Sequence, residues 1–292
     1  MSEAMVKGNS IEETIRKRYS CRSYRETSLA KDDRDNLAQF VSQNITGPFG
    51  SSARFTLFAA ESSASSELKG LGTYGFIKNP AAFVAGVVKE SEMNPEDFGY
   101  SMERIILHAT DLGLGTCWLG GSFKRSSFAE KAGIGAGESV PAVASIGYIA
   151  DKKTTTDQML KVSAGSKKRK SADELFFDRK IKKLNIDFDK GYGKALEMVR
   201  LAPSASNRQP WRVVKEDGKN TFHFYLERSS VYSGIIKFMR YADLQKIDMG
   251  IAMCHFECSA IESGLRGMWV NESPGEIKTP AGWEYSITWE GK

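Results

Sequence analysis

Two arginines and a serine alternate near the start of the chain, as Arg18, Ser20 and Arg22. In an extended segment alternate side chains point to the same side, so this trio would present two positive charges and a hydroxyl together. Guanidinium groups bind phosphate through charge-assisted hydrogen bonds worth about 1.5–3 kcal/mol each. The spacing therefore predicts a phosphate clamp, and the alternative is a solvated basic face.

A polar loop bounded by prolines occupies residues 202–211, with the sequence Ala-Pro-Ser-Ala-Ser-Asn-Arg-Gln-Pro-Trp. Pro203 and Pro210 interrupt a helical pattern before them and a strand pattern after them, because proline lacks an N–H and restricts the preceding residue. Small hydroxyl and amide side chains between them offer donors and acceptors without bulk. Two interpretations stay open: a surface loop whose Trp211 enters the core, or one wall of a site for a flat molecule with a polar edge.

Two further stretches are rich in glycine. Gly120 and Gly121 directly follow the apolar run 116–119, and residues 70–77 carry three glycines around Tyr74. Glycine permits unusual backbone angles and lets amide N–H groups approach a ligand closely. Each stretch is therefore either an ordinary turn or a place where the backbone passes close to another group.

The composition is that of a globular protein without a membrane span. Of 292 residues, 41% are hydrophobic and 26% charged, and 41 basic against 36 acidic residues leave a formal charge of +5. No apolar run approaches the roughly 18–20 residues of a membrane helix, and the polar start has no signal-peptide core. Four cysteines without framework spacing suit a reducing compartment. We expect a cytoplasmic protein that binds neither membrane nor nucleic acid.

Hydrophobic periodicity predicts alternating helices and strands. The predicted helices cover residues 11–18, 31–43, 94–112, 126–131, 190–201 and 247–264. The predicted strands cover residues 55–60, 82–88, 116–119, 142–149 and 211–214, with a closing strand near 283–289. Cys254, His255 and Cys258 fall within the last helix, where a third or fourth metal ligand is not evident, so we expect no metal site.

The chain repeats itself at an offset of 151 positions. Residues 97–102 match 248–253 at this offset, and the pairs Ala109–Ala260, Gly113–Gly264, Leu114–Leu265 and Trp118–Trp269 follow it. The repeat predicts two tandem α+β units, residues 1–172 and 173–292, the first ending in a linker tail. Fused copies commonly replace the two subunits of a homodimer. We therefore expect a pseudo-two-fold dimer within one monomeric chain.

Three segments together resemble hallmark segments of the FMN-dependent nitroreductase family. They are the Arg-x-Ser-x-Arg trio at 18–22, the run Gly-Leu-Gly-Thr-Cys-Trp-Leu-Gly-Gly at 113–121, and the loop at 202–211. The resemblance covers nearly the whole chain. Residues 72–78 with 98–100 also resemble a subgroup that carries two half-units in one polypeptide. This likeness implies a nitroreductase-like α+β fold with FMN bound between two units.

The resemblance also implies roles for individual residues. It assigns the FMN phosphate and ribityl chain to Arg18, Ser20 and Arg22, with Lys167 and Arg169 closing on the same phosphate. It assigns a backbone N–H near flavin N5 to Gly120 and Gly121. It assigns the polar edge and side of the flavin ring to residues of the other unit, namely Pro203, Ser204, Ala205 and Asn207.

Each copy lacks what the other retains. The first copy has Gly-Pro-Phe-Gly-Ser-Ser-Ala-Arg at 47–54 in place of the polar loop. The second has Phe-Asp-Arg-Lys-Ile-Lys-Lys at 177–183 in place of the clamp, and Arg-Gly-Met-Trp-Val-Asn-Glu at 266–272 in place of the paired glycines. We therefore expect one composite FMN site per chain, with its symmetry mate lost.

The activity implied by the resemblance is that of an NAD(P)H oxidoreductase. Hydride would pass in a ping-pong reaction from NADH or NADPH through FMN N5 to an electron-poor small molecule, by default a nitroaromatic or a quinone. No acid–base side chain is obligatory, because the flavin does the chemistry. Two alternatives remain: a flavin-binding or flavin-storage protein without efficient turnover, and an anion-binding surface over residues 161–183, which the mild net charge disfavours.

Overall fold

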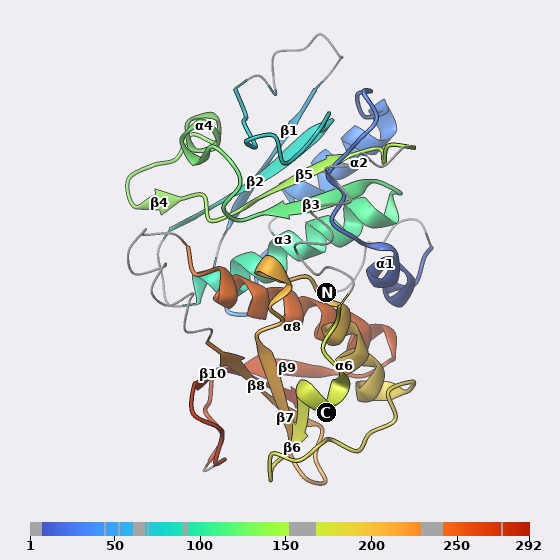
Figure 1. Cartoon of the computed structure of the whole chain (residues 1–292), viewed down its shortest axis with the longest axis vertical. Coiled ribbons are helices and arrows are strands. Elements are labelled where there is room, and N and C mark those ends of the chain that lie inside the picture. Colours follow the sequence, from blue (N-terminus) through green and yellow to red (C-terminus); the bar gives the residue numbers. More distant parts are fainter. Residues whose placement is uncertain are drawn as a thin grey trace. The chain divides into compact units, whose positions relative to one another are not determined.

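The computed structural model describes residues 8–43, 45–51, 53–60, 68, 70–89, 93–151, 168–228, 242–275 and 277–292. The chain divides into two compact units, Met1–Ala164 and Gly165–Lys292, where the repeat predicted a boundary after residue 172. Each unit combines one five-stranded sheet with helices (Figure 1). The predicted α+β class is therefore confirmed.

The sheet of the first unit has the strand order β1-β2-β5-β3. These strands are β1 (Arg54–Ala59), β2 (Ala82–Lys89), β5 (Val143–Gly147) and β3 (Gly115–Leu119), and all neighbours are antiparallel. The short β4 (Glu138–Ser139) pairs with the end of β2. All of β2 except its last residue is buried, as expected for an apolar run in the centre of a sheet.

Four helices accompany this sheet. They are α1 (Ile11–Lys17), α2 (Lys31–Ser42), α3 (Asn94–Asp111) and α4 (Arg125–Lys131). The long α3 contacts β2 and β3, while α2 packs against α3 and β1 and α1 packs against α3 (Figure 1). A Cβ added at Gly86 of β2 would overlap the ring of Phe98 on α3. Glycine is thus required where helix and sheet approach each other most closely.

The sheet of the second unit has the strand order β6-β7-β8-β10-β9. Its strands are β6 (Phe176–Asp178), β7 (Trp211–Lys215), β8 (Thr221–Glu227), β10 (Trp283–Gly291) and β9 (Gly267–Val270). The short β6 runs parallel to β7, and the other neighbours are antiparallel. The sequence predicted β7 and the closing strand, but not β6, β8 or β9.

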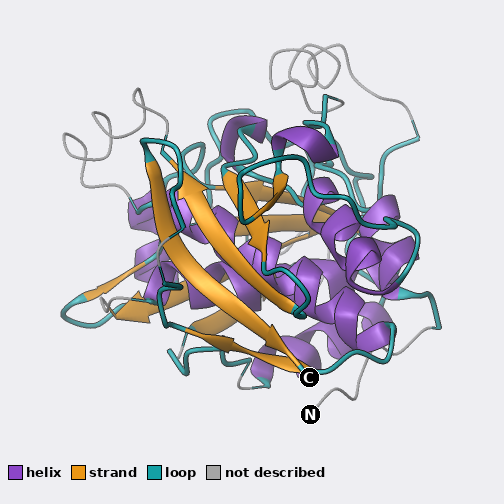
Figure 2. Ribbon diagram, turned by 90° about the horizontal axis from the view of Figure 1, so that it is seen from below, coloured by secondary structure: helices purple, strands orange, loops and turns teal. Residues whose placement is uncertain are grey.

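Helices α6 (Gly191–Leu201) and α8 (Leu244–Glu262) pack against each other, and α8 also packs on β7 and β8 (Figure 1). Figure 2 colours the described helices and strands of both units by type. Phe256 of α8 is fully buried at the centre of this layer. Its ring lies 5.2–5.9 Å from five other aromatic rings, those of Tyr192, Phe222, Phe224, Trp269 and Trp289. Packing of large aromatic rings therefore dominates the core of this unit.

The two units share one topology. The order β1-β2-β5-β3 corresponds to β7-β8-β10-β9, and α3 and α8 each connect the second strand of this set to the strand at its far edge. Both long helices end at a glycine with positive φ, +83° at Gly113 and +74° at Gly264. The predicted tandem repeat of an α+β unit is thus confirmed, while the pseudo-two-fold relation between the copies stays a prediction.

A buried aspartate near the start of each long helix holds a loop. In the first unit this loop precedes β1, and in the second unit it precedes β7. Asp97 of α3 accepts hydrogen bonds from Phe49 N (3.0 Å, to Oδ1) and Ser51 N (2.8 Å, to Oδ2). Its repeat partner Asp248 of α8 accepts from Ala205 N, at 2.9 Å to Oδ1 and 3.1 Å to Oδ2. Loops of different sequence are therefore anchored in the same way.

The two aspartates differ in the hydrogen bonds that would be lost on substitution by asparagine. Asp97 uses one oxygen for each of two N–H donors, so Asp97→Asn places an amide NH₂ group against one of them. Asp248 shares a single N–H between both oxygens, so Asp248→Asn keeps the bond. We expect Asp97→Asn to lower the free energy of unfolding relative to Asp248→Asn by about 1–3 kcal/mol, the penalty for one unsatisfied buried donor.

The pH dependence of stability gives a second comparison of the two sites. Burial raises the pKa of Asp97 above the ordinary carboxyl value of 3.8 and raises the pKa of Asp248 well above it, so the folded chain holds protons at these sites, chiefly at Asp248, that the unfolded chain has released. The resulting stability is greatest at low pH and is lost as the pH rises through the folded-state pKa. Urea unfolding at pH 4 and pH 7 measures this effect. The contribution of Asp248 to the loss of stability between these pH values should be absent from Asp248→Asn. Equal damage by both asparagine variants at pH 7 would contradict the geometry.

Candidate functional site

The segment from Arg18 to Tyr24 leaves α1 in extended conformation and runs beside β3. Arg18 caps α1 with φ −64° and ψ 128°, and Cys21 N donates to Thr116 O of β3 at 2.8 Å. Ser20 forms a parallel bridge with the same Thr116. The trio predicted to form a clamp is therefore fixed to the strand that leads to the paired glycines.

The three clamp residues gather around the thiol of Cys117 on β3. Burial raises the pKa of Cys117 to about 11, against the positive charges of Arg22 and Arg18 and a hydrogen bond with Ser20. Arg22 also donates to the backbone oxygen of Ser20 at 3.4 Å. Two guanidinium groups and one hydroxyl thus lie near one point at this edge of the sheet.

Arg18 is buried without a hydrogen-bond acceptor for its Nε. Only 5% of its side chain is exposed, and Nε has no hydrogen-bond partner among the residues that the structure describes. The nearest carboxylate oxygen, Glu103 Oε1, lies 3.8 Å from Nε. Burial lowers the pKa of Arg18, and the charge of Glu103 opposes this. Because an unsatisfied buried charge is costly, this guanidinium fits a site for an anion such as a phosphate.

The loop after β3 is fixed by Arg125 of α4. Its Nη2 donates to Gly120 O at 3.1 Å, and its Nη1 donates to Val140 O at 3.3 Å. Neither Gly120 nor Gly121 has a positive φ, and a Cβ at Gly121 would meet no heavy atom within 4 Å. Neither backbone strain nor internal packing therefore requires a glycine at position 121.

The glycine-rich turn before β2 connects the clamp with the segment that follows these glycines. Lys78 N donates to Arg22 O at 2.8 Å, and Lys124 N donates to Gly72 O at 2.8 Å. At the tip of this turn Tyr74 has φ 49° and is 69% exposed, and Phe76 is 41% exposed. The backbone predicted to pass close to another group thus passes against both parts of the first unit's candidate site.

The polar loop of the second unit is strained and firmly held. Ser206, Asn207 and Gln209 all have positive φ, between 50° and 54°, which is rare for residues other than glycine. Ser204 Oγ accepts from Gln209 N at 2.8 Å, and Trp211 is fully buried. Strain of this kind persists only where the surroundings fix it, and it concentrates at functional sites.

Arg169 lies against this loop within the second unit. Its Nη1 donates to Asn207 Oδ1 at 2.6 Å and its Nη2 to Leu201 O at 2.9 Å. Asn207 in turn donates through Nδ2 to Lys168 O at 2.9 Å. The structure therefore brings Arg169 and Asn207 together, a contact that the sequence did not indicate. Lys167 lies outside the described residues.

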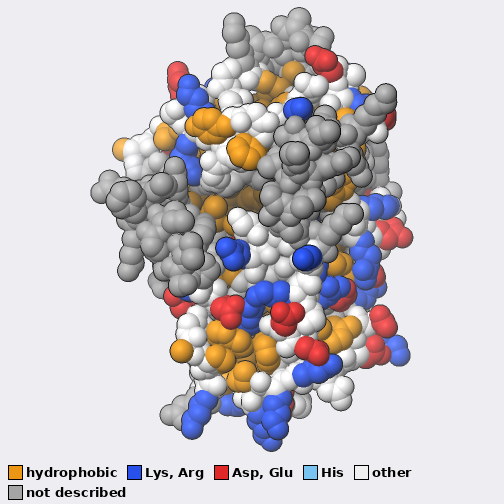
Figure 3. Space-filling model, in the orientation of Figure 1, with side chains coloured by type: hydrophobic (Ala, Val, Ile, Leu, Met, Phe, Trp, Pro, Cys, Tyr) orange, Lys and Arg blue, Asp and Glu red, His pale blue; other side chains and the backbone are white. Residues whose placement is uncertain are grey.

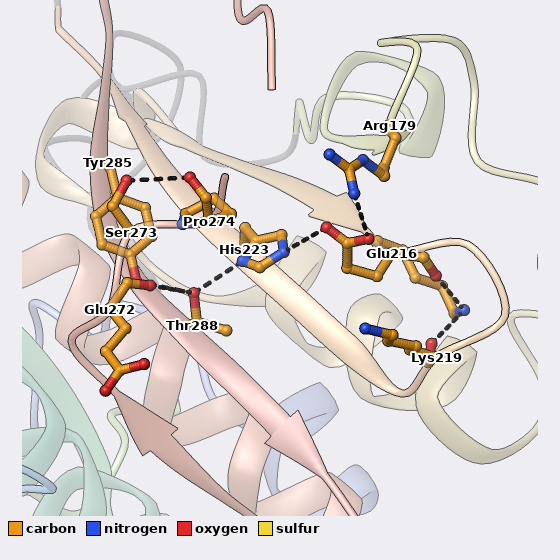
Figure 4. A network of polar contacts seen from close by, with 10 residues as sticks. Arg179, Glu216, Lys219, His223, Glu272, Ser273, Pro274, Tyr285 and Thr288 are labelled. Atoms are coloured by element: carbon orange, nitrogen blue, oxygen red, sulfur yellow. Dashed lines mark hydrogen bonds and ion pairs between the residues drawn. The ribbon is translucent and has the colours of Figure 1, made fainter. Parts of the chain in front are cut away.

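A polar network crosses the neighbouring strands β8 and β10 of the second sheet (Figure 4). His223 contacts Glu216 Oε1 through Nε2 at 3.0 Å and Thr288 Oγ1 through Nδ1 at 2.8 Å, and Thr288 lies 2.8 Å from the hydroxyl of Tyr285. The order of carboxylate, imidazole and hydroxyl is that of a hydrolytic triad. Only 2% of Thr288 is exposed, so a substrate cannot reach this hydroxyl and the network serves to join β8 and β10.

Other kinds of site find little support in the structure. Within the described ranges, no three His, Cys, Asp or Glu side chains are grouped so as to hold a metal ion. None of the described helices has the length and apolar character needed to cross a bilayer. On the face shown in Figure 3, basic and acidic side chains of the described residues are intermixed, unlike the basic stripe of a nucleic-acid interface.

Comparison with solved structures finds the fold in a putative nitroreductase from Thermotoga maritima MSB8, with a TM-score of 0.56, 19% identity and 99% of each chain covered. A nitroreductase with bound FMN from Bacteroides fragilis NCTC 9343 matches 50% of this chain and 94% of its own, with a TM-score of 0.37 and 19% identity. An FMN-dependent nitroreductase from Clostridium difficile R20291 matches 48% and 88%, with a TM-score of 0.39 and 21% identity.

A search of the curated proteins found no match to this sequence. A model of the family described as "Putative TM nitroreductase" matches residues 10–260, which is most of the chain. The fold of the solved T. maritima protein agrees with this match over the full length. The chain therefore belongs to the putative TM nitroreductase family.

Proposed function

We propose that this protein is an FMN-dependent NAD(P)H oxidoreductase of nitroreductase type, with one FMN site per chain. The observation that carries the proposal is Arg18, a buried guanidinium whose Nε has no acceptor among the described residues. Ser20 and Arg22 lie beside it around Cys117. This donor set suits the dianionic phosphate of FMN, which accepts several charge-assisted hydrogen bonds at once.

The remaining parts of the proposed site follow the resemblance. Gly121 is exposed, and no heavy atom of the protein lies where its Cβ would be, so a flavin ring could approach its N–H. For the polar edge of the ring, the proposal uses residues of the strained loop in the second unit, namely Pro203, Ser204, Ala205 and Asn207. Arg169, bonded to Asn207, and Lys167 complete the set. This assignment rests on the residue types and on the resemblance to the family.

Bound FMN would supply the hydride-transfer chemistry, with NADH or NADPH as reductant and an electron-poor nitroaromatic or quinone as the default acceptor. The role of the protein would be to bind, orient and polarise the FMN. Arg18 and Arg22 neutralise the phosphate, and a backbone N–H at Gly121 fixes the ring by a hydrogen bond that no side chain has to supply. The proposal includes a monomer that acts in the cytoplasm, where both nicotinamide nucleotides occur.

The flavin content and its reduction test the proposal directly. We expect the absorbance spectrum of the pure protein, saturated with FMN, to show about one flavin per chain, and we expect NADH or NADPH to bleach it under anaerobic conditions. Two flavins per chain would contradict the loss of the second site. Bound flavin that neither nucleotide reduces would favour the flavin-storage alternative, and no binding at saturation would refute the proposal.

Substitution of Arg18, followed by the same binding measurements, tests whether this residue binds the phosphate of FMN. Arg18→Met should weaken FMN binding about 10- to 150-fold, the equivalent of one charge-assisted hydrogen bond, and should leave the binding of riboflavin, which has no phosphate, unchanged. Arg16→Met on the same helix, whose side chain is 49% exposed and pairs with Glu12, is the matched control. Equal loss of FMN and riboflavin binding would place the phosphate elsewhere.

Gly121→Ala tests the proposed approach of the ring to the backbone. The added methyl meets no protein atom within 4 Å and φ is not positive, so the thermal midpoint of the flavin-free protein should not change. If the ring lies against this N–H, the methyl displaces it, and the affinity for FMN should fall by about tenfold or more. Gly275→Ala, in equally open space, is the control and should bind normally. Normal FMN binding and reduction by Gly121→Ala would remove this residue from the site.

A further inference from the structure

A single carboxylate lies between the clamp and the strand that carries the glycines. Glu103 of α3 has a fully buried side chain. Its Oε2 accepts a hydrogen bond from the indole Nε1 of Trp118 at 2.6 Å. Its Oε1 lies 3.8 Å from Arg18 Nε, close enough for charge attraction and too far for a hydrogen bond. The Glu103 carboxylate therefore accepts a hydrogen bond from Trp118 and lies near Arg18 without a hydrogen bond to its Nε.

This spacing matters because Arg18 is expected to bind an anion. Arginine and carboxylate form short, paired hydrogen bonds when their geometry allows it, and burial strengthens such bonds. A carboxylate bonded directly to Arg18 would occupy the donors that a phosphate needs. At 3.8 Å the same carboxylate balances the buried charge of Arg18 and leaves Nε without a hydrogen bond.

We propose that Trp118 is a positioning residue for the anion site: its indole N–H holds the Glu103 carboxylate short of hydrogen-bonding distance to Arg18, and thereby keeps the guanidinium open to the phosphate. This inference rests on the proposed function in that it takes FMN as the ligand. It adds Trp118 as a residue that affects FMN affinity without contacting the flavin.

The second unit supplies an internal comparison. Trp269, the repeat partner of Trp118, donates through Nε1 to Glu257 Oε2 of α8 at 2.8 Å. The segment of this unit that corresponds to the clamp carries no Arg-x-Ser-x-Arg pattern. Glu257 is not the repeat partner of Glu103, because position 254, at the offset of 151, is a cysteine. The second unit therefore forms a tryptophan–glutamate bond of the same kind from a different position of its long helix, where no phosphate clamp is expected. Trp269→Phe is thus a control that removes the same kind of bond.

The test compares FMN and riboflavin affinities of four variants with those of the native chain. Trp118→Phe should weaken FMN binding about tenfold, because the released carboxylate bonds to Arg18, and should leave riboflavin binding unchanged. Glu103→Gln should bind FMN at least as tightly as the native chain. The double variant Trp118→Phe/Glu103→Gln should recover the native affinity, since no carboxylate is left to compete. Trp269→Phe should have no effect.

Recovery in the double variant is the decisive result, because a loss of packing at position 118 would not be repaired by a change at 103. A double variant as weak as Trp118→Phe, or native affinity in Trp118→Phe, would overturn the inference. If Trp118→Phe fails to fold, Glu103→Gln decides alone: weaker FMN binding would show that the carboxylate supports Arg18 and would overturn the inference, and equal or tighter binding supports it.

Failure of the proposed function remains distinguishable. If the native chain binds no FMN, the proposed function is refuted, and the same variants are titrated with inorganic phosphate by thermal shift. A phosphate-induced stabilisation that is lost in Trp118→Phe and restored in the double variant would uphold the role of Trp118. The absence of any response to phosphate in the native chain would overturn it.

Discussion

The free energy of burying ionisable side chains is the constraint to which both units respond. Asp97 and Asp248 are almost completely buried near the starts of α3 and α8, and each is tolerated because backbone N–H groups point at it. These bonds hold the loop that leads into the first strand of the shared topology. The long helix, the loop and the strand are thereby fixed as one piece, and the residues of the candidate site lie on the edges of these pieces.

Two buried arginines meet this constraint in different ways. Arg212 is 4% exposed, donates to the backbone oxygens of Gln209 and Trp211, and pairs with Glu227. Arg18 is 9% exposed, yet its Nε has no hydrogen-bond acceptor among the described residues. In the second unit, acceptors of the protein itself satisfy the buried guanidinium of Arg212. In the first unit, Arg18 Nε has no hydrogen-bond acceptor among the described residues. The anionic ligand of the proposed function would account for this difference.

The sequence predicted the elements that depend on local pattern. The apolar stripe of α3, the continuous apolar run of β2 and the offset that relates Asp97 to Asp248 were all visible in it. The strand β8 was not predicted, because His223 and Tyr225 interrupt its apolar character. His223 is buried there only through partners on β10 and in the turn after β7. Short β6 and β9 depend on pairing with strands distant in sequence, which local pattern does not encode.

The candidate site was predictable to the extent that its residues form motifs. Spacing alone indicated Arg18, Ser20 and Arg22 as a group, since alternation places them on one side of an extended segment. The bond between Arg169 and Asn207 joins residues 38 positions apart, and the Glu103 carboxylate meets Trp118 from a different element. Neither contact has a signature in the sequence, because each depends on how a helix or a loop packs against its neighbours.

Comparison of the two copies within the chain separates residues that serve folding from residues that serve a ligand. Two features occur at equivalent positions of both units, namely the buried aspartate and the glycine that ends the long helix. The equivalent tryptophans Trp118 and Trp269 each donate to a glutamate of the long helix, but the two glutamates are at different positions of the repeat. The features present in one unit only are the alternating arginines and the paired glycines, the residues to which the proposed function assigns the phosphate and the flavin ring. Trp118 resembles Trp269 in donating to a glutamate of the long helix. It differs in that its glutamate lies 3.8 Å from the buried Arg18 Nε, and the role that we propose for Trp118 depends on this difference.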